Sequence, residues 1–227
     1  MKAVLFDLDN TLIDFMRMKK ISCEAAISAM IDGGLDMGKQ EAYDLLFELY
    51  GIHGIEYQEI FQKFLEKTMG KIDYRVLSKG IAAYRKMQIG YLEPYPHVRA
   101  TLLMLKEKGI MLGIVSDAPR MRAWLRLAEM GLTDFFDVVV TLDDTGQTKP
   151  SELPFKAAVT ALGVEPKDIL FVGDNPERDI KGAQKVGMRT GLAKYGQLFP
   201  DNGVKADFEL KDITDLVAIV GDFHKNK

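Results

Sequence analysis

Two acidic residues, Asp7 and Asp9, are the first residues of the chain that could do chemistry. They lie in the stretch FDLDNT at residues 6–11, directly after the apolar run at residues 3–6. Aspartate and asparagine are common in turns and at helix starts, so a purely structural role is one interpretation. The alternative is a reactive carboxylate at the end of a buried strand. Residues elsewhere in the chain distinguish the structural interpretation from the catalytic one.

Polar side chains also follow later apolar runs of the sequence. They are Ser116 and Asp117 after residues 110–115, Lys149 after residues 137–141, and Asp174 with Asp179 after residues 168–173. Taken singly, each of these residues is common in turns or on a surface. Taken together, they supply a nucleophile, a proton donor, a hydroxyl group, a fixed cation and acids for a metal. This combination predicts a phosphoryl-transfer site.

Short apolar runs predict the strands that would position these side chains. They are residues 3–6, 110–115, 137–141, 168–173 and 188–193. Most are nearly continuous and β-branched, and helical patterns such as residues 98–108 and 154–162 separate them. This arrangement is typical of a Rossmann-like α/β fold with a parallel sheet buried on both faces. Ligands of such folds bind beyond the carboxyl ends of the strands, where the polar residues lie.

Residues 15–92 differ from the rest because they show helical periodicity and no convincing strand. The clearest periodic stripe is Tyr57, Ile60, Phe61, Phe64, Leu65 and Thr68. Glycines at 33–34, 51–54 and 70 divide the segment into about four helices. We therefore predict an α/β core domain of residues 1–14 and 93–227, with a helical bundle of residues 15–92 inserted after the first strand.

The composition excludes several classes of protein. With 47% hydrophobic and 28% charged residues and a net charge of −3, the chain is an ordinary globular protein without the basic balance of a nucleic-acid-binding protein. No apolar run approaches the roughly 20 residues of a membrane span. Acids interrupt the first apolar run before a signal peptide could form. The single cysteine, Cys23, excludes an internal disulfide. We expect a cytoplasmic protein, monomeric or homodimeric, that binds neither nucleic acid nor membrane.

The motifs, in their order along the chain, resemble those of the haloacid dehalogenase-like (HAD) hydrolase superfamily. The resemblance is to the branch with a helical cap inserted after the first strand. The stretch FDLDNTL resembles the first family motif, IVSD the second, the lysine of TKP the third, and VGDNPERDIKGAQKVGMRT the fourth with the helix and strand that follow. The resemblance spans essentially the whole chain.

This resemblance implies a role for each acid of the first motif. Asp7 would attack phosphorus and become an aspartyl phosphate. Asp9 would protonate the leaving group and then activate the water that hydrolyses the intermediate. Their two-residue offset would direct both acids to one side of an extended chain. Mg²⁺ would be bound by the carboxylates of Asp7 and Asp174 and by the backbone carbonyl of Asp9.

The resemblance also implies how the phosphate is held. Ser116 would donate a hydrogen bond to a phosphoryl oxygen, and Lys149 would supply the fixed cation. Asp179 would act from behind the metal ligands, through a water or by orienting Lys149. Thr11 would shape the phosphate-binding loop, and Asp117 stands where other members carry Asn, Thr or another small residue, so it could adjust substrate preference.

The expected function is a magnesium-dependent phosphatase acting on a small phosphorylated metabolite. Triose phosphates and phosphoglycolate are suggested by family analogy alone. A 2-haloacid dehalogenase needs no metal and lacks an acid at the position of Asp9, and a sugar-phosphate mutase usually has a small apolar residue in place of Thr11. A signalling domain phosphorylated on aspartate carries its acids as neighbours and its phosphorylated Asp on a later strand.

Two further features have open roles. His97 stands where many family members have glycine, and we interpret it as a packing or solvated residue, with a position facing the site as the alternative. The basic residues Arg17, Lys19 and Lys20 follow the first motif. We interpret them as a solvated helix face, with contact to an anionic substrate as the alternative.

Overall fold

The computed structural model describes residues 1–225 and divides into two compact units. The α/β unit is formed by Met1–Asp14 and Glu93–Lys227, and the helical unit by Phe15–Leu92. Each unit has a hydrophobic core of its own. The chain therefore leaves the α/β unit directly after the first motif and returns to it for the other three.

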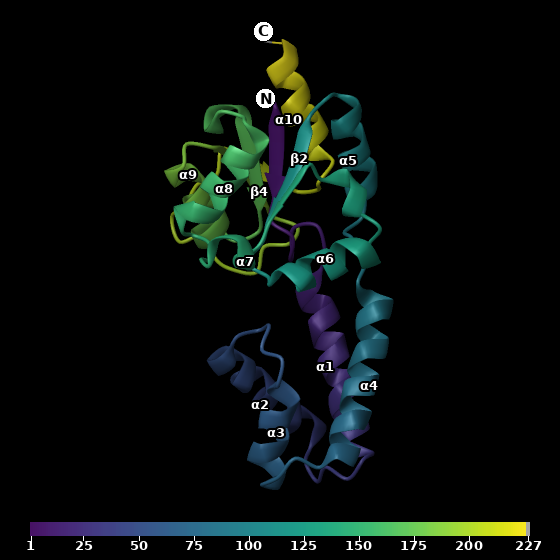
Figure 1. Ribbon diagram of the computed structural model, residues 1–227. Helices are drawn as coiled ribbons and strands as arrows, with labels where there is room; N and C mark the ends of the chain where they lie inside the picture. Colours follow the sequence, from purple (N-terminus) through teal and green to yellow (C-terminus); the bar gives the residue numbers. More distant parts are fainter. Residues whose placement is uncertain (226–227) are drawn as a thin grey trace. The chain divides into compact units, whose positions relative to one another are not determined.

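A parallel sheet forms the centre of the α/β unit (Figure 1). Its strands are β1 (Ala3–Phe6), β2 (Met111–Val115), β3 (Val138–Val140), β4 (Ile169–Gly173), β5 (Arg189–Ala193) and β6 (Phe208–Leu210). Their order is β3-β2-β1-β4-β5-β6, and every neighbouring pair is parallel. The strand order reverses on either side of β1. This switch point, at the carboxyl ends of β1, β2 and β4, is where such sheets bind ligands.

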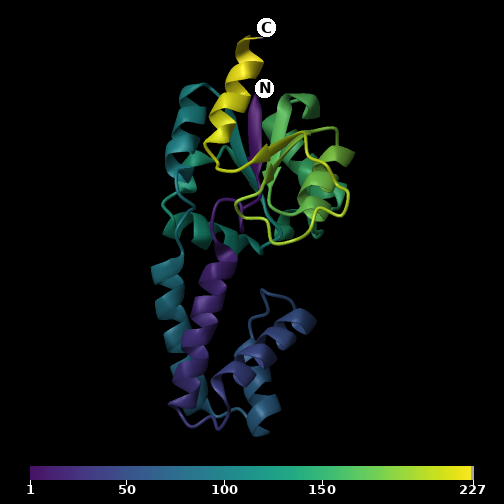
Figure 2. The same ribbon diagram turned by 180° about the vertical axis from the view of Figure 1, so that it is seen from behind.

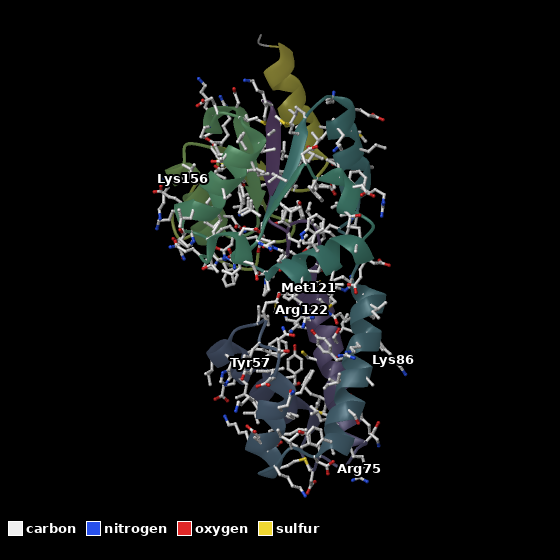
Figure 3. All side chains as sticks on the ribbon, viewed as in Figure 1. Tyr57, Arg75, Lys86, Met121, Arg122 and Lys156 are labelled. Carbon is white, nitrogen blue, oxygen red and sulfur yellow. The ribbon has the colours of Figure 1, made fainter. Side chains whose placement is uncertain are left out.

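Helices cover both faces of the sheet. Those of the α/β unit are α5 (Val98–Glu107), α6 (Arg120–Glu129), α7 (Leu142–Thr145), α8 (Glu152–Leu162), α9 (Lys181–Lys185) and α10 (Asp215–Lys225), with short helical turns at Thr133–Phe135, Pro166–Asp168 and Pro176–Ile180. Figure 1 shows α8 and α9 on one side of the strands and α5 and α10 on the other. On α8, Phe155 packs edge-to-face on Phe171 of β4, whereas Lys156 extends away from the sheet (Figure 3).

The helical unit contains α1 (Phe15–Ile31), α2 (Lys39–His53), α3 (Ile60–Met69) and α4 (Tyr74–Tyr91). Long α1 and α4 pack side by side, and α2 packs on α3 (Figure 2). Apolar faces of these helices form one buried cluster that includes Met30, Leu46 and Phe64. The predicted number of helices in this segment is thus confirmed. Across residues 1–225, no helix has both the length and the apolar character that crossing a bilayer requires.

The structure corrects three details of the predicted elements. Strand β6 was not predicted because three residues, one of them exposed, carry too little periodic signal. Helix α8 begins at Glu152 instead of Pro154, because the Ser151 hydroxyl accepts a hydrogen bond from the N–H of Leu153 and caps an earlier start. Helix α2 continues through Gly51 and ends at His53, directly before Gly54, whose φ is 92°.

The segments of the α/β unit that directly precede and follow the helical unit in sequence lie next to each other. Ile13 and Pro94 form an antiparallel bridge. The N–H of Tyr95 donates to the carbonyl of Leu12 over 2.9 Å. The segment that leaves the α/β unit and the segment that returns to it are therefore held together by backbone hydrogen bonding.

The start of α4 gives a first testable prediction. Asp73 caps this helix, and its carboxylate accepts from the N–H groups of Arg75 (2.9 Å) and Val76 (3.3 Å). Asp73→Ala leaves both donors without this acceptor and should lower the free energy of unfolding by about 1 kcal/mol. Urea denaturation followed by far-UV circular dichroism measures the change. The control is Asp36→Ala, which removes an exposed carboxylate of the same unit; an equal loss there would contradict a capping role.

Candidate active site

The site begins where β1 ends. Asp7 follows the last residue of β1, and its N–H continues the ladder by donating to the carbonyl of Val172 on β4 (2.8 Å). The Asp7 side chain is buried, with 4% of its surface exposed. Its Oδ1 lies 2.6 Å from the ammonium of Lys149. Among the described residues, no group offers a hydrogen bond to its Oδ2. One carboxylate oxygen is therefore held in place and the other is left for a ligand.

Lys149 is the buried cation at the centre of the site. Its ammonium, fully excluded from solvent, lies 2.6 Å from Asp7 Oδ1 and 2.7 Å from Asp179 Oδ1, and it donates to the Val115 carbonyl over 2.9 Å. Asp7 and the Val115 carbonyl accept hydrogen bonds from the ammonium, whereas the contact with Asp179 is an ion pair. Burial alone would lower the pKa of Lys149, but Asp179 and Asp7 outweigh it and raise that pKa. Lys149 is thus a permanent positive charge.

Asp174 and Asp179 complete a group of buried carboxylates. Oxygens of Asp7, Asp174 and Asp179 lie within 4.8 Å of one another. Within residues 1–225, neither oxygen of Asp174 has a hydrogen-bond partner. Burial first, and then the charges of Asp179 and Asp7, raise the pKa of Asp174 to about 9. A cation between these acids would favour the ionised form and satisfy the orphaned oxygens.

Local geometry holds Asp179 in this group. It belongs to the π-helical turn Pro176–Ile180, and its Oδ2 accepts from the N–H of Asn175 (3.0 Å). The Asn175 side chain in turn caps the turn by accepting from the N–H of Arg178 (3.0 Å). Gly173, the last residue of β4, is required here, because a Cβ atom at that position would lie 2.5 Å from the Asp179 side chain.

Ser116 and Asp117 follow β2 at the same edge of the sheet. Ser116 is buried, and its N–H donates to the carbonyl of Val140 on β3 (2.9 Å). The Asp117 carboxylate accepts from the backbone N–H of Lys149 (2.8 Å) and forms an ion pair with Arg178 (3.3 Å). Through these contacts the Asp117 side chain links the loop that carries Lys149 to the turn that carries Asp179.

Asp9 lies beyond the end of β1, in the loop that follows the strand. Strand β1 ends at Phe6, and Asn10, directly after Asp9, adopts a left-handed conformation (φ 59°). The Asp9 carboxylate is not in the carboxylate group that surrounds Lys149. Its Oδ2 accepts from Nη1 of Arg126, on α6, over 2.6 Å. The two acids thus have different ionic partners.

The loop that contains Thr11 is held by residues from beyond β5. The hydroxyl of Tyr195 donates to the carbonyl of Thr11 (2.9 Å). Gly196 lies so close to the carbonyl of Asn10 that a Cβ atom would be 1.6 Å from that oxygen. Thr11 itself is fully buried. These contacts fix the loop that follows the first motif, which gives Asn10 and Thr11 structural tasks.

Comparison with known proteins identifies the family. The family model described as haloacid dehalogenase-like hydrolase matches residues 4–193. The chain belongs to this family. It is 32% identical over 228 residues to a glyceraldehyde 3-phosphate phosphatase of Methanocaldococcus jannaschii, covering 99% of each chain. It is 30% identical over 220 residues to a phosphoglycolate phosphatase of Aquifex aeolicus, covering 97% of each.

A solved structure supports the same conclusion for the fold. The HAD phosphatase from Thermococcus onnurineus matches this structure with a TM-score of 0.69 at 28% sequence identity, covering 97% of this chain and 98% of that one. The predicted HAD-like family and the predicted α/β architecture are both confirmed.

Two uncertain features of this HAD-like hydrolase now have a structural explanation. His97, directly before α5, has a φ of 67°, a conformation that favours glycine, and its exposed ring pairs with Asp212 (3.0 Å). The solvated-face interpretation is wrong for Lys19. This residue is buried in the helical unit, with its ammonium 4.3 Å from the ring centre of Tyr50 and 5.3 Å from that of Tyr84.

The sequence-based prediction missed two arginines of the HAD site. Arg126 shares the buried stripe of α6 with Ala123 and Leu127. The sequence did contain a signal for this residue, because a charged side chain stands where the helical pattern predicts an apolar one. Arg178 lies inside the fourth motif, and nothing in its spacing distinguishes it from a surface residue. Its ion pair with Asp117 depends on the fold.

The close packing of Gly173 gives a second prediction. Gly173→Ala should push Asp179 away from Lys149 and lower the free energy of unfolding by about 1–3 kcal/mol, the usual cost of overpacking. Chemical denaturation measures this loss. The matched control is Gly90→Ala in α4, where a new Cβ meets no atom within 4 Å and should stabilise the helix slightly. Unchanged stability of Gly173→Ala would contradict the packing described here.

Proposed function

We propose that this HAD-like hydrolase is a magnesium-dependent phosphatase that cleaves a small phosphorylated metabolite through an aspartyl phosphate on Asp7. The observation that carries the proposal is the arrangement of the Asp7 carboxylate. Lys149 holds its Oδ1 at 2.6 Å, while its buried Oδ2 has no hydrogen-bond partner among the described residues. A buried orphan oxygen is costly unless a ligand uses it.

The donor set fits a magnesium ion. Asp7 and Asp174 offer buried carboxylate oxygens, the hard ligands that Mg²⁺ prefers, and three of these oxygens lack partners within residues 1–225. The side chains of the site contribute five carboxylates and three basic groups, which is an excess of two negative charges when every acid is ionised, as a bound cation would favour. We assign Asp7, Asp174 and the backbone carbonyl of Asp9 as ligands. When bound, the ion would offset the repulsion between Asp7 and an anionic phosphate.

The residues then divide the reaction into two steps. Asp7 attacks phosphorus, the bond between phosphorus and the leaving oxygen breaks, and Asp9 gives that oxygen its proton. In the second step a water attacks phosphorus, its proton goes to Asp9, and the bond to Asp7 breaks to release phosphate. Lys149 and Ser116 hold the phosphoryl oxygens during both steps. Asp179 and Asp117 orient Lys149 through its ammonium and its backbone N–H.

The relatives support a short phosphorylated substrate. Relatives that align over nearly the whole chain include proteins named for glyceraldehyde 3-phosphate and phosphoglycolate, two small phosphate monoesters, and others named as pyrophosphatases. We extend this substrate class to the present chain. The proposed cytoplasmic location rests on low cysteine usage, because the single Cys23 excludes an internal disulfide and fits a reducing compartment.

Phosphate release tests the proposal directly. With Mg²⁺, the purified protein should release phosphate from glyceraldehyde 3-phosphate, phosphoglycolate or related monoesters in a metabolite panel. Asp7→Asn should lower kcat by on the order of 10³-fold or more, because the nucleophile is lost. The control Asp134→Asn changes an exposed carboxylate of the same unit and should keep wild-type rates. A dehalogenase would instead stay active in chelator, and a signalling domain would not turn over.

Metal binding gives a separate prediction that does not depend on turnover. At a Mg²⁺ concentration 100 times Kd, the wild-type protein should gain about 2.7 kcal/mol of stability. Asp174→Asn removes a ligand oxygen, but without metal the raised pKa of Asp174 already keeps this carboxyl largely protonated at neutral pH, so the variant should match the metal-free stability of wild type and should lose the Mg²⁺-dependent gain. Thermal unfolding with and without Mg²⁺ measures both effects. The same gain in Asp174→Asn and wild type would exclude Asp174 as a ligand.

A further inference from the structure

The ion pair between Arg126 and Asp9 differs from an ordinary surface salt bridge. Nη1 of Arg126 lies 2.6 Å from Oδ2 of Asp9, and the side chains are only 7% and 23% exposed. Water and salt screen such a contact much less than an exposed pair. A largely buried guanidinium also pays a desolvation cost that a good ionic partner must offset.

Packing does not explain an arginine at this position of α6. Ala123 and Leu127, three residues before and one after Arg126, are fully buried, and Met130 continues the same face of the helix. An apolar side chain of similar length would fill this stripe without the desolvation cost. The presence of arginine therefore depends on what its guanidinium contacts, and Asp9 is one such contact at 2.6 Å.

The ion pair with Arg126 restrains the side chain of Asp9. Asp9 lies beyond the end of β1, in a loop whose next residue has a positive φ. An aspartate in such a loop can rotate about two side-chain bonds, and each rotamer directs its oxygens differently. By contrast, Asp7 is held by Lys149, and Asp179 is held by Lys149 and the N–H of Asn175.

We propose that Arg126 is a positioning residue for both proton transfers of the phosphatase reaction, and this inference rests on the function proposed above. By binding Oδ2, Arg126 holds the carboxylate in one orientation, so that Oδ1 is the oxygen that gives a proton to the leaving group and later takes one from water. Helix α6 starts just after Ser116 and Asp117. The element that follows the second motif thereby orients the acid of the first.

The test compares substrates that differ in their need for a proton donor. An alkyl phosphate, such as glyceraldehyde 3-phosphate or the best alkyl substrate of the panel, releases a basic alkoxide that must be protonated. Dinitrophenyl phosphate releases a stable phenolate that needs no proton. For Arg126→Met, kcat/KM should fall on the order of 10²-fold with the alkyl phosphate, because the acid is misplaced. With dinitrophenyl phosphate it should stay nearly unchanged.

Three further variants separate positioning from a structural role. Arg126→Lys should recover part of the loss, because lysine keeps a charge and a donor. The double variant Asp9→Asn/Arg126→Met should lose no more activity than Asp9→Asn alone, because both changes disable the same proton transfer. The control Arg120→Met breaks an ion pair with Asp144 at the exposed start of the same helix and should leave both substrates unaffected.

The outcomes distinguish this inference from the function itself. If the wild-type protein hydrolyses neither substrate, the proposed phosphatase activity fails. If the wild type is active and Arg126→Met lowers kcat/KM equally for both substrates, or raises only KM, then Arg126 supports the fold or binds the substrate and the positioning role is wrong. Additive losses in the double variant would overturn it as well.

Discussion

The buried ammonium of Lys149 is the interaction on which the site of this phosphatase depends. It contacts Asp7 after β1, the Val115 carbonyl at the end of β2 and Asp179 after β4. A buried charge is stable only with such partners, and the two carboxylates need the same cation for the same reason. Because β1 lies between β2 and β4 in the sheet, the segments that follow these three strands lie close together. Loss of Lys149 would leave Asp7 and Asp179 as uncompensated buried charges.

Much of the α/β unit could be predicted because its signals are local. Apolar runs predict the central strands, and parallel strands have to end at one edge of the sheet, so the residues that follow them meet there. Asp7, Lys149, Asp174 and Asp179 meet in this way. This part of the prediction required only a correct sheet, not any knowledge of side-chain contacts.

The remaining features depend on contacts that a single sequence does not reveal. Arg126 and Lys19 are charged residues at buried helical positions, and their partners are far away along the chain or on other helices. The ion pair of Asp9 with Arg126 could not be derived from strand alternation, because it depends on a helix far away along the chain. Local pattern therefore predicts which residues belong to the site, whereas tertiary contacts decide how each of them is held.

The backbone bridge between Ile13 and Pro94 has a consequence for how the inserted helices can change during evolution. Since the α/β unit itself holds together the two ends of the inserted segment, it does not depend on the insert to bring them close. The entropy cost of closing a loop grows slowly, by about 0.6 kcal/mol for each doubling of its length. Helices between these two points can therefore be lengthened, replaced or recombined at little cost to the sheet. The catalytic unit is free to keep one chemistry while its inserted neighbour diversifies.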